Sequence, residues 1–192
     1  MEYELPEDKI PIFNLNFEKG NELASGLTII KGQGNSKLGF WNKRKAKQAI
    51  KHYSECLSML PNHWQTHWLI AKVYQAMSEN EKALEHFEKA VKIEKTNSNL
   101  PREASISAMN SGNVKLAVEY SQEAIKRESN DAGLYCNHAV NLMVLGNDDE
   151  AKAYIQKAME MEPNDEINKN VYSLINAIAT GKRKRPKYNE LN

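Results

Sequence analysis

Apolar and small residues recur along most of the chain in steps of three and four. This spacing places them on one face of a helix. It predicts helices over residues 42–60, 64–77, 81–93, 102–110, 114–127, 132–145, 148–161 and 166–180, and an earlier helix that begins near Asn21 and continues through Leu23, Leu27, Ile30, Gly34 and Leu38. No stretch alternates between apolar and polar residues as a strand does, so we expect an all-α fold.

Small residues also recur over a much longer interval. Two series have a period of 34 residues: Ala49, Ala83, Ala117 and Ala151, and, seven residues later, Cys56, Ala90, Ala124 and Ala158. A fixed period of this length indicates copied helix pairs that stack on one another, because no pair buries its apolar face alone. Small side chains are needed where the helices of neighbouring pairs cross, since a bulky residue overpacks such a contact.

Aligned on this period, the chain resembles the tetratricopeptide repeat. Residues 132–165 match it best, through Tyr135, Ala139, Leu142, Gly146, Ala151, Ile155, Ala158 and Pro163. Residues 64–97 match through Ala71, Tyr74, Ala83, Phe87 and Ala90. Residues 98–131 have Pro101 and Ser121 where large apolar residues are usual, so this repeat is expected to be the loosest.

The resemblance implies a right-handed superhelical solenoid of about four antiparallel helix pairs. The expected repeats are residues 21–63, 64–97, 98–131 and 132–165, followed by a capping helix over residues 166–180. The first repeat matches clearly only in its second helix. Its first helix fits if about three residues are inserted near residues 39–45, in a family whose unit has a fixed length.

The two ends of the chain lack the repeat pattern. Residues 1–20 contain Pro6 and Pro11 and no helical period, so we expect an extended or disordered segment. A further hypothesis places this segment in the binding groove through Leu5, Ile10 and Phe13. Residues 181–192 form a basic tail with five Lys or Arg residues and one Glu, which suits a nuclear import signal, a patch for an anionic partner or a solvated end.

The resemblance also implies a concave groove, lined by the first helix of each repeat, that holds a peptide or a partner helix. Carried over by position, the partner-binding residues are Gln65, Trp68, Lys72, Gln75, Arg102, Ile106, Met109, Asn110, Asn137, Val140 and Met143. Trp and Met side chains suit apolar residues of a partner. The alternative is that some of them pack against the cap or the N-terminal segment.

We therefore expect a protein–protein interaction module or adaptor. The alternative is a structural assembly subunit that self-associates through its repeats. One specific ligand is disfavoured. Chaperone adaptors of this family hold a C-terminal carboxylate with five Lys, Asn and Arg residues, and the corresponding positions here are Lys31, Asn35, Leu69, Asn99 and Glu103. An acid in place of a cation repels a carboxylate.

No combination of residues points to catalysis, a metal or a cofactor, and we expect none of the three. His63 and His67 are four residues apart but lack a third ligand, and we interpret them as turn and core residues. Cys56 stands at a packing position, and Cys136 has no histidine partner in the sequence pattern.

Composition and charge limit the class of partner. The 192 residues include 41% hydrophobic and 27% charged residues, with a net charge of +1, so no overall field attracts nucleic acid or a membrane. No apolar run reaches the roughly 20 residues that cross a bilayer, and the acidic start lacks a secretion signal. We expect a cytoplasmic protein, or a nuclear one in a eukaryote because of the tail, that binds a protein or peptide and no nucleic acid or membrane; self-association is left open.

Overall fold

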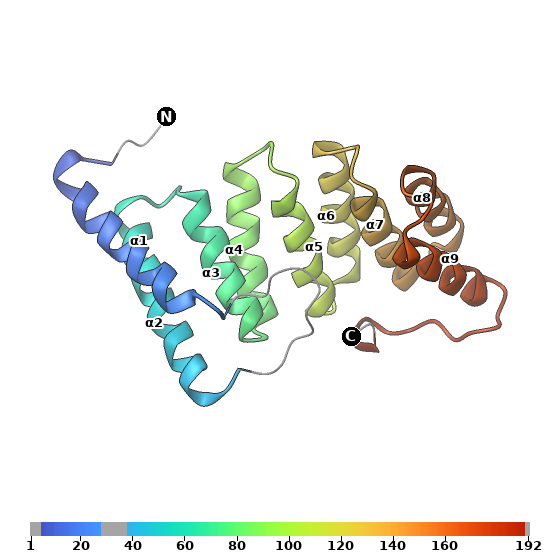
Figure 1. The fold of residues 1–192 in the computed structure, drawn as a ribbon, viewed down its shortest axis with the longest axis horizontal. Coiled ribbons are helices and arrows are strands. Elements are labelled where there is room, and N and C mark those ends of the chain that lie inside the picture. Colours follow the sequence, from blue (N-terminus) through green and yellow to red (C-terminus); the bar gives the residue numbers. More distant parts are fainter. Residues whose placement is uncertain (1–4, 28–37, 191–192) are drawn as a thin grey trace. The chain divides into compact units, whose positions relative to one another are not determined.

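The computed structural model describes residues 5–27 and 38–190 of the chain. Within these ranges the chain forms nine α-helices and two short 3-10 helices without a strand, which confirms the all-α class (Figure 1). The chain divides into two compact units, residues 1–95 and residues 96–192. None of the described helices is long and apolar enough to cross a membrane.

Unit 1 consists of two antiparallel helix pairs. Its elements are η1 (Glu7–Lys9), α1 (Ile10–Ala24), α2 (Phe40–Met59), α3 (Trp64–Ala76) and α4 (Asn80–Ile93). Helix α1 packs on α2 and α3 packs on α4, and α2 contacts α3 (Figure 1). The core between them consists of Ala24, Leu27, Ala46, Ala49, Tyr53, Ile70 and Val73.

Residues 7–20 are helical, which corrects the expectation of an extended or disordered segment over residues 1–20 for the part that the structure describes. Helix α1 begins at Ile10 with Pro11 in its first turn, where the missing N–H removes no hydrogen bond within the helix. Phe13, Phe17, Gly20 and Ala24 follow at steps of four, three and four and form the face that packs on α2. In the sequence the two prolines argue against a helix, so this regular apolar face was not predicted.

The first repeat is therefore built differently from the expectation. Its helices are α1 and α2, joined by residues 25–39, whereas three residues join α3 to α4. The helix predicted from Asn21 onward instead ends at Ala24, and part of its predicted length, residues 28–37, lies outside the described residues. The chain needs no insertion near residues 39–45, because the extra residues stand between the two helices.

The hypothesis that the N-terminal segment occupies the groove is also wrong for Phe13. The Phe13 ring is buried and packs on Phe17, with ring centroids 5.9 Å apart, and edge-on against His63 at 5.2 Å. The Cys56 thiol donates to the Phe13 carbonyl at 3.5 Å. Phe13 is a core residue of the first helix pair.

Unit 2 consists of two further helix pairs and a final helix. Its elements are α5 (Asn99–Asn110), α6 (Val114–Arg127), α7 (Ala132–Leu145), α8 (Asp148–Met161), α9 (Glu166–Ala179) and η2 (Tyr188–Glu190). Helix α9 packs against α8 and α7 and buries Ile175 and Ile178 (Figure 1). This is the position expected of a capping helix, since it covers the apolar face of the last pair.

The two small-residue series are buried, as expected of positions where helices pack closely. All eight residues are at most 1% exposed: Ala49, Ala83, Ala117, Ala151, Cys56, Ala90, Ala124 and Ala158. Burial raises the pKa of the Cys56 thiol to about 11, so it remains protonated at neutral pH. Cys56 therefore serves as a small packing residue.

Three turns within helix pairs have the same left-handed residue. Ser78, Gly112 and Gly146 are each 34 residues apart and have φ values of 61°, 84° and 105°. In each case the next residue donates its N–H to the carbonyl five residues back, from Glu79 to Tyr74 at 2.9 Å and equivalently in the other two turns. This pattern terminates a helix and favours glycine, yet the first turn uses serine.

Part of the basic tail, at Arg185 and Tyr188, lies against the helices of unit 2. Both terminal nitrogens of Arg185 donate to the Asp148 carboxylate, each at 2.8 Å, and Arg185 also donates to the Met143 carbonyl. The Tyr188 ring lies 3.1 Å from the position of a Cβ at Gly112. The remaining cations of the tail are exposed: Lys182, Arg183, Lys184 and Lys187.

Candidate functional site

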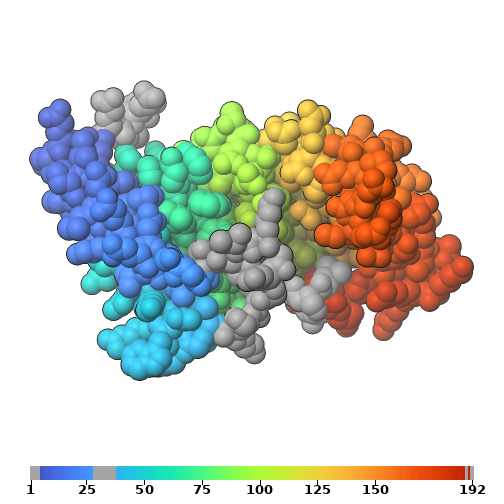
Figure 2. Space-filling view, viewed as in Figure 1, coloured from blue at the N-terminus to red at the C-terminus, as the bar shows by residue number. Residues whose placement is uncertain are grey.

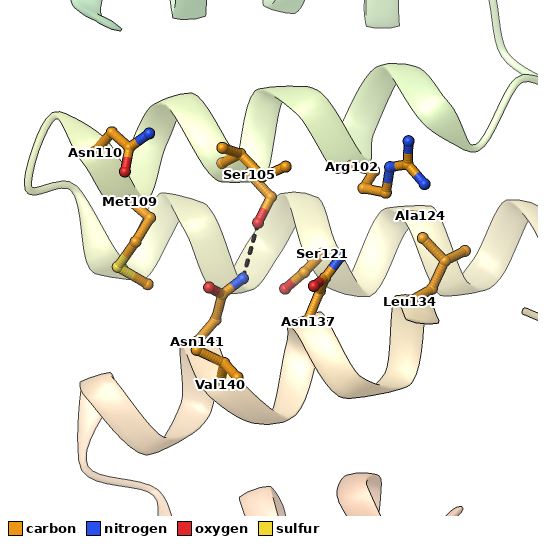
Figure 3. A pocket seen from close by; sticks show the side chains of 11 residues that line it. Arg102, Ser105, Met109, Asn110, Ser121, Ala124, Leu134, Asn137, Val140 and Asn141 are labelled. Carbon is orange, nitrogen blue, oxygen red and sulfur yellow. Dashed lines mark hydrogen bonds between the residues drawn. The ribbon is translucent and has the colours of Figure 1, made fainter. Parts of the chain in front are cut away.

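A cavity of about 300 Å³ opens among α5, α6 and α7 of unit 2 (Figure 3). Helix α5 contributes most of one wall and α7 the other, while α6 contributes two small residues between them. The lining residues are Arg102, Ser105, Ile106, Met109, Asn110, Ser121, Ala124, Leu134, Asn137, Val140 and Asn141.

The cavity has a cause in the sequence. The residue four positions after each alanine of the first series is Tyr53, Phe87, Ser121 and Ile155 in turn, and all four are buried. Three of them fill the space between neighbouring helices with a large side chain. Ser121 fills much less of it, and its side chain lines the cavity.

Hydrogen bonds among buried polar groups form the floor of the cavity. The Ser105 hydroxyl donates to the Ala117 carbonyl at 2.8 Å. The Asn141 amide donates to Ser105 Oγ at 2.8 Å and to the same carbonyl at 3.2 Å (Figure 3). Since buried polar groups are costly to leave unpaired, these bonds hold α5, α6 and α7 in one arrangement. The cavity is therefore preformed.

A second polar contact lies behind Ser121. Its Oγ is 2.7 Å from His138 Nδ1 and 3.0 Å from the Val118 carbonyl, to which the hydroxyl can donate. The His138 ring packs edge-on against Tyr154, with centroids 4.4 Å apart. Burial lowers the pKa of His138 to about 4, so the imidazole is neutral at neutral pH.

This serine–histidine contact differs from a hydrolytic pair. In such a pair a third group, usually a carboxylate, orients the histidine. No carboxylate in the described part of the chain is found hydrogen-bonded to His138, and the serine hydroxyl also contacts the carbonyl one turn earlier. We interpret the contact as the packing of α6 on α7.

The rim of the cavity combines amide, cationic and apolar groups. Asn137 is exposed and Asn110 is half-buried, and amide side chains both donate and accept hydrogen bonds. Ile106 is 41% exposed, so it offers an apolar surface at the rim. The Arg102 guanidinium is half-buried and lies 3.8 Å from the Glu103 carboxylate. This set suits a ligand that has both polar and apolar groups.

Comparison with known proteins agrees with this architecture. Residues 65–97 and 132–165 match the family model of the tetratricopeptide repeat. The chain contains tetratricopeptide repeats. A search of curated protein sequences found no match. The family match covers one helix pair of each unit, α3–α4 and α7–α8.

Several solved structures share the fold of this repeat protein. The MamA protein superposes with a TM-score of 0.73 at 17% identity, over 88% of this chain and 83% of that one. YrrB, described as a tetratricopeptide repeat protein with an unusual peptide-binding site, superposes with a TM-score of 0.69 at 20% identity, over 93% of this chain and 81% of that one. The first repeat domain of Spaghetti (RPAP3), bound to an HSP90 peptide, superposes with a TM-score of 0.57 at 16% identity, over 61% of this chain and 93% of that one. At these identities the likeness concerns the fold.

The structure brings together six of the partner-binding residues predicted from the repeat register. Arg102, Ile106, Met109, Asn110, Asn137 and Val140 all line the cavity. Met143 does not, because its side chain is fully buried in the core of unit 2. The prediction that Met143 contacts a partner is therefore wrong.

The other four predicted residues lie on α3 in unit 1. Gln65, Trp68, Lys72 and Gln75 are all half-buried, and they do not line this cavity. The Trp68 indole nitrogen is withdrawn from solvent without a hydrogen-bond partner in the described part of the chain. Their contact with a partner stays a prediction.

The register did not identify the residues that shape the cavity. Ser105, Ser121, Ala124, Leu134 and Asn141 line it but are absent from the predicted set. Ser121 carried a signal, since it breaks a series of large apolar residues. That signal predicts a loose repeat, but a missing side chain in a stack of rigid helices leaves a defined space.

The structure also bears on the chaperone clamp and on the histidine pair considered from the sequence. Of the positions of the chaperone clamp, Lys31 and Asn35 lie outside the described residues, and Glu103 forms the ion pair with Arg102. His67 Nε2 lies 3.0 Å from the Pro61 carbonyl and Nδ1 lies 3.0 Å from His86 Nδ1, so both of its ring nitrogens are engaged. Over residues 5–27 and 38–190, no three His, Cys, Asp or Glu side chains are grouped to hold a metal ion.

Proposed function

We propose that this protein is a non-catalytic adaptor that holds a segment of a partner protein in the cavity of unit 2. The observation that carries the proposal is a preformed cavity with a polar floor and an exposed isoleucine at its rim. Two of the solved structures with this fold are described with a peptide or a peptide-binding site, which supports the same class of ligand.

The geometry favours an extended peptide. Asn110 and Asn137 stand on opposite walls, and their amides match the donor and acceptor groups of a peptide backbone. Ile106 and Val140 offer apolar contact for a partner side chain. A volume of about 300 Å³ is at the lower end for ligand pockets, so one or two side chains fill it. Arg102 favours a peptide with an acidic group.

A displayed peptide library tests the proposal. The wild-type protein should enrich a defined sequence, and a synthetic peptide of that sequence should bind it. Ile106→Asp should weaken that binding more than tenfold, as loss of a buried anchor does, and Asn137→Ala should weaken it less. Asn170→Ala is the control because Asn170 is an exposed asparagine on α9. Enriched peptides whose affinity is the same for all of these variants would refute the assignment.

Self-association is the second candidate function, because α1 has exposed apolar residues. Ile10, Ile12 and Leu15 are 40%, 54% and 52% exposed. Ile12 and Leu15 are one turn apart on the same face, as in an interface between helices. Light scattering over a range of concentrations should show a dimer or larger species that Ile12→Asp abolishes. A monomer at every concentration would exclude this candidate.

A further inference from the structure

The start of α2 carries two adjacent aromatic side chains that are mostly exposed. Phe40 is 75% exposed and Trp41 is 70% exposed, more than the other large hydrophobic residues that the structure describes. Their ring centroids are 5.5 Å apart at an interplanar angle of 78°. The first turns of α2 lie at the surface of unit 1 (light blue, lower left in Figure 2). Large exposed apolar groups of this kind mark interaction sites.

A run of cations follows the aromatic pair directly. Lys43, Arg44, Lys45, Lys47 and Lys51 are all exposed. The sequence has no Asp or Glu between Glu22 and Glu55, so residues 40–54 hold five Lys or Arg and no acid, a local charge of +5. The net charge of +1 for the whole chain conceals this patch. An anionic partner is complementary to it.

Phe40 and four of the five basic side chains share one face of α2. Counted from Phe40, the cations Lys43, Arg44, Lys47 and Lys51 follow at three, four, seven and eleven residues. The opposite face carries Ala46, Ala49, Tyr53 and Cys56, which are fully buried. The basic face is therefore the one that remains outside when α2 packs on its neighbours.

We propose that the start of α2 docks this protein on an anionic lipid surface, with Phe40 and Trp41 at the level of the headgroups and the cations on the lipid phosphates. Tryptophan concentrates at this depth of a bilayer, and phenylalanine is common on the apolar face of helices that lie at the membrane surface. Basic residues beside them gain affinity from anionic lipids. Because none of the described helices can cross a bilayer, the association is peripheral and reversible.

The geometry of the two rings distinguishes a lipid surface from a single-stranded nucleic acid. Cations and aromatic residues also bind nucleic acid, but there the bases stack on open ring faces. Here the nearly perpendicular contact between Phe40 and Trp41 places the edge of one ring on the face of the other. A compact aromatic cluster at the end of a helix suits insertion between headgroups better than base stacking.

Sedimentation with lipid vesicles tests the proposal. The protein should sediment with vesicles that mix phosphatidylserine and phosphatidylcholine, should not sediment with phosphatidylcholine alone, and should be released by salt, since screening weakens the attraction. Of the three tryptophans, Trp41 is the exposed one, and Trp64 and Trp68 are half-buried. Binding should therefore shift the tryptophan emission to shorter wavelength, and Trp41→Phe should remove the shift while most of the binding remains.

Matched variants locate the surface. The triple variant Lys43→Gln, Arg44→Gln, Lys47→Gln should lower vesicle partitioning about a hundredfold, since each basic residue contributes about fivefold. The control removes three exposed cations from the tail, Lys182→Gln, Arg183→Gln and Lys184→Gln, and should bind like the wild type. Thermal unfolding verifies that both variants fold.

Three results would overturn the proposal. The first is no sedimentation of the wild-type protein with phosphatidylserine vesicles at low salt. The second is loss of binding in the tail variant but not in the α2 variant. The third is binding to a single-stranded homopolymer RNA that the α2 variant loses, without any binding to vesicles, which would assign the patch to nucleic acid.

Discussion

The ring of Tyr53 lies directly against the backbone of Gly20. A Cβ atom at residue 20 would stand 2.5 Å from Tyr53 Cε1, a separation that packed atoms do not reach. Tyr53 is fully buried, and its hydroxyl donates to the Asn21 side chain at 2.8 Å. The ring is thus fixed from both ends, and the close contact brings α1 onto α2.

Replacing Gly20 should therefore destabilise unit 1. We expect Gly20→Val to lower the free energy of unfolding by about 1–3 kcal/mol, because the buried Tyr53 ring has no room to move away. Urea unfolding followed by circular dichroism measures the change. Lys19→Val is the control, since it places the same residue at an exposed position of the same helix. Equal stability of the two variants would show that the contact is not tight.

The left-handed serine in the turn between α3 and α4 predicts a stabilising substitution. Ser78 has φ of 61°, where the two equivalent turns use glycine. We expect Ser78→Gly to raise the free energy of unfolding by about 1 kcal/mol, because a side chain in this conformation is strained. The control Ser54→Gly, at an exposed position within α2, should instead lower it by about 0.5 kcal/mol. A loss in both variants would contradict the assignment of strain.

Buried histidines predict that stability falls in mild acid. Burial lowers the pKa of His86 and of His138 to about 4, from an ordinary value of 6.5. As the pH falls from 6.5 towards 4, the unfolded chain binds protons that the folded chain excludes, so the free energy of unfolding decreases. Chemical unfolding at about pH 7 and about pH 5 should show this loss.

A variant at position 138 isolates one contribution to this pH dependence. His138→Gln keeps a polar group near Ser121 but cannot gain a proton. Its stability should depend less on pH than that of the wild type over the same interval. If the two proteins lost the same free energy between those pH values, protonation of His138 would not contribute.

The pairing of Arg185 with Asp148 predicts how the tail is held. Asp148→Asn removes the negative charge, and the pKa of the Asp148 carboxyl is lowered chiefly by its hydrogen bonds from Arg185. We expect trypsin to cleave the tail severalfold faster in this variant, with a loss of about 1 kcal/mol or less in the stability of the unit. Mass spectrometry of a digestion time course measures the rate.

Asp149→Asn separates the pairing from a general charge effect. Asp149 is the neighbouring exposed acid in the first turn of α8 and has the same favourable position for the helix dipole. Its replacement should leave the cleavage rate of the tail unchanged. Faster cleavage in both variants would mean that the start of α8, and not the ion pair, protects the tail.

Prediction from the sequence succeeded where the helical period is uninterrupted. The helices over residues 114–127, 132–145 and 148–161 have the predicted bounds. The prediction for the first repeat was wrong because Pro11 lies inside a helix and because 15 residues connect Ala24 to the next helix. Neither feature disturbs the packing of α1 on α2, but each interrupts a pattern that is read along the chain.

For the candidate site too, the sequence predicted some residues correctly and could not predict others. The repeat register identified six residues around the cavity, because α5 and α7 are the first helices of their pairs and present the same helical face. It wrongly included Met143, since the packing within unit 2 decides where the exposed face of α7 ends. It missed Ser105 and Asn141, whose roles depend on hydrogen bonds between helices.

The sequence by itself determined the all-helical class, the helix-pair repeat and the small buried residues of both series, because these follow from periods of a few residues and of 34 residues. Only the tertiary structure decided that α1 completes the first pair and that Ser121 leaves a cavity instead of a loose repeat. It also decided that Arg185 fastens the tail to Asp148. These three features depend on how much space the surrounding helices leave and on contacts between residues far apart in the chain. A local sequence pattern contains neither kind of information.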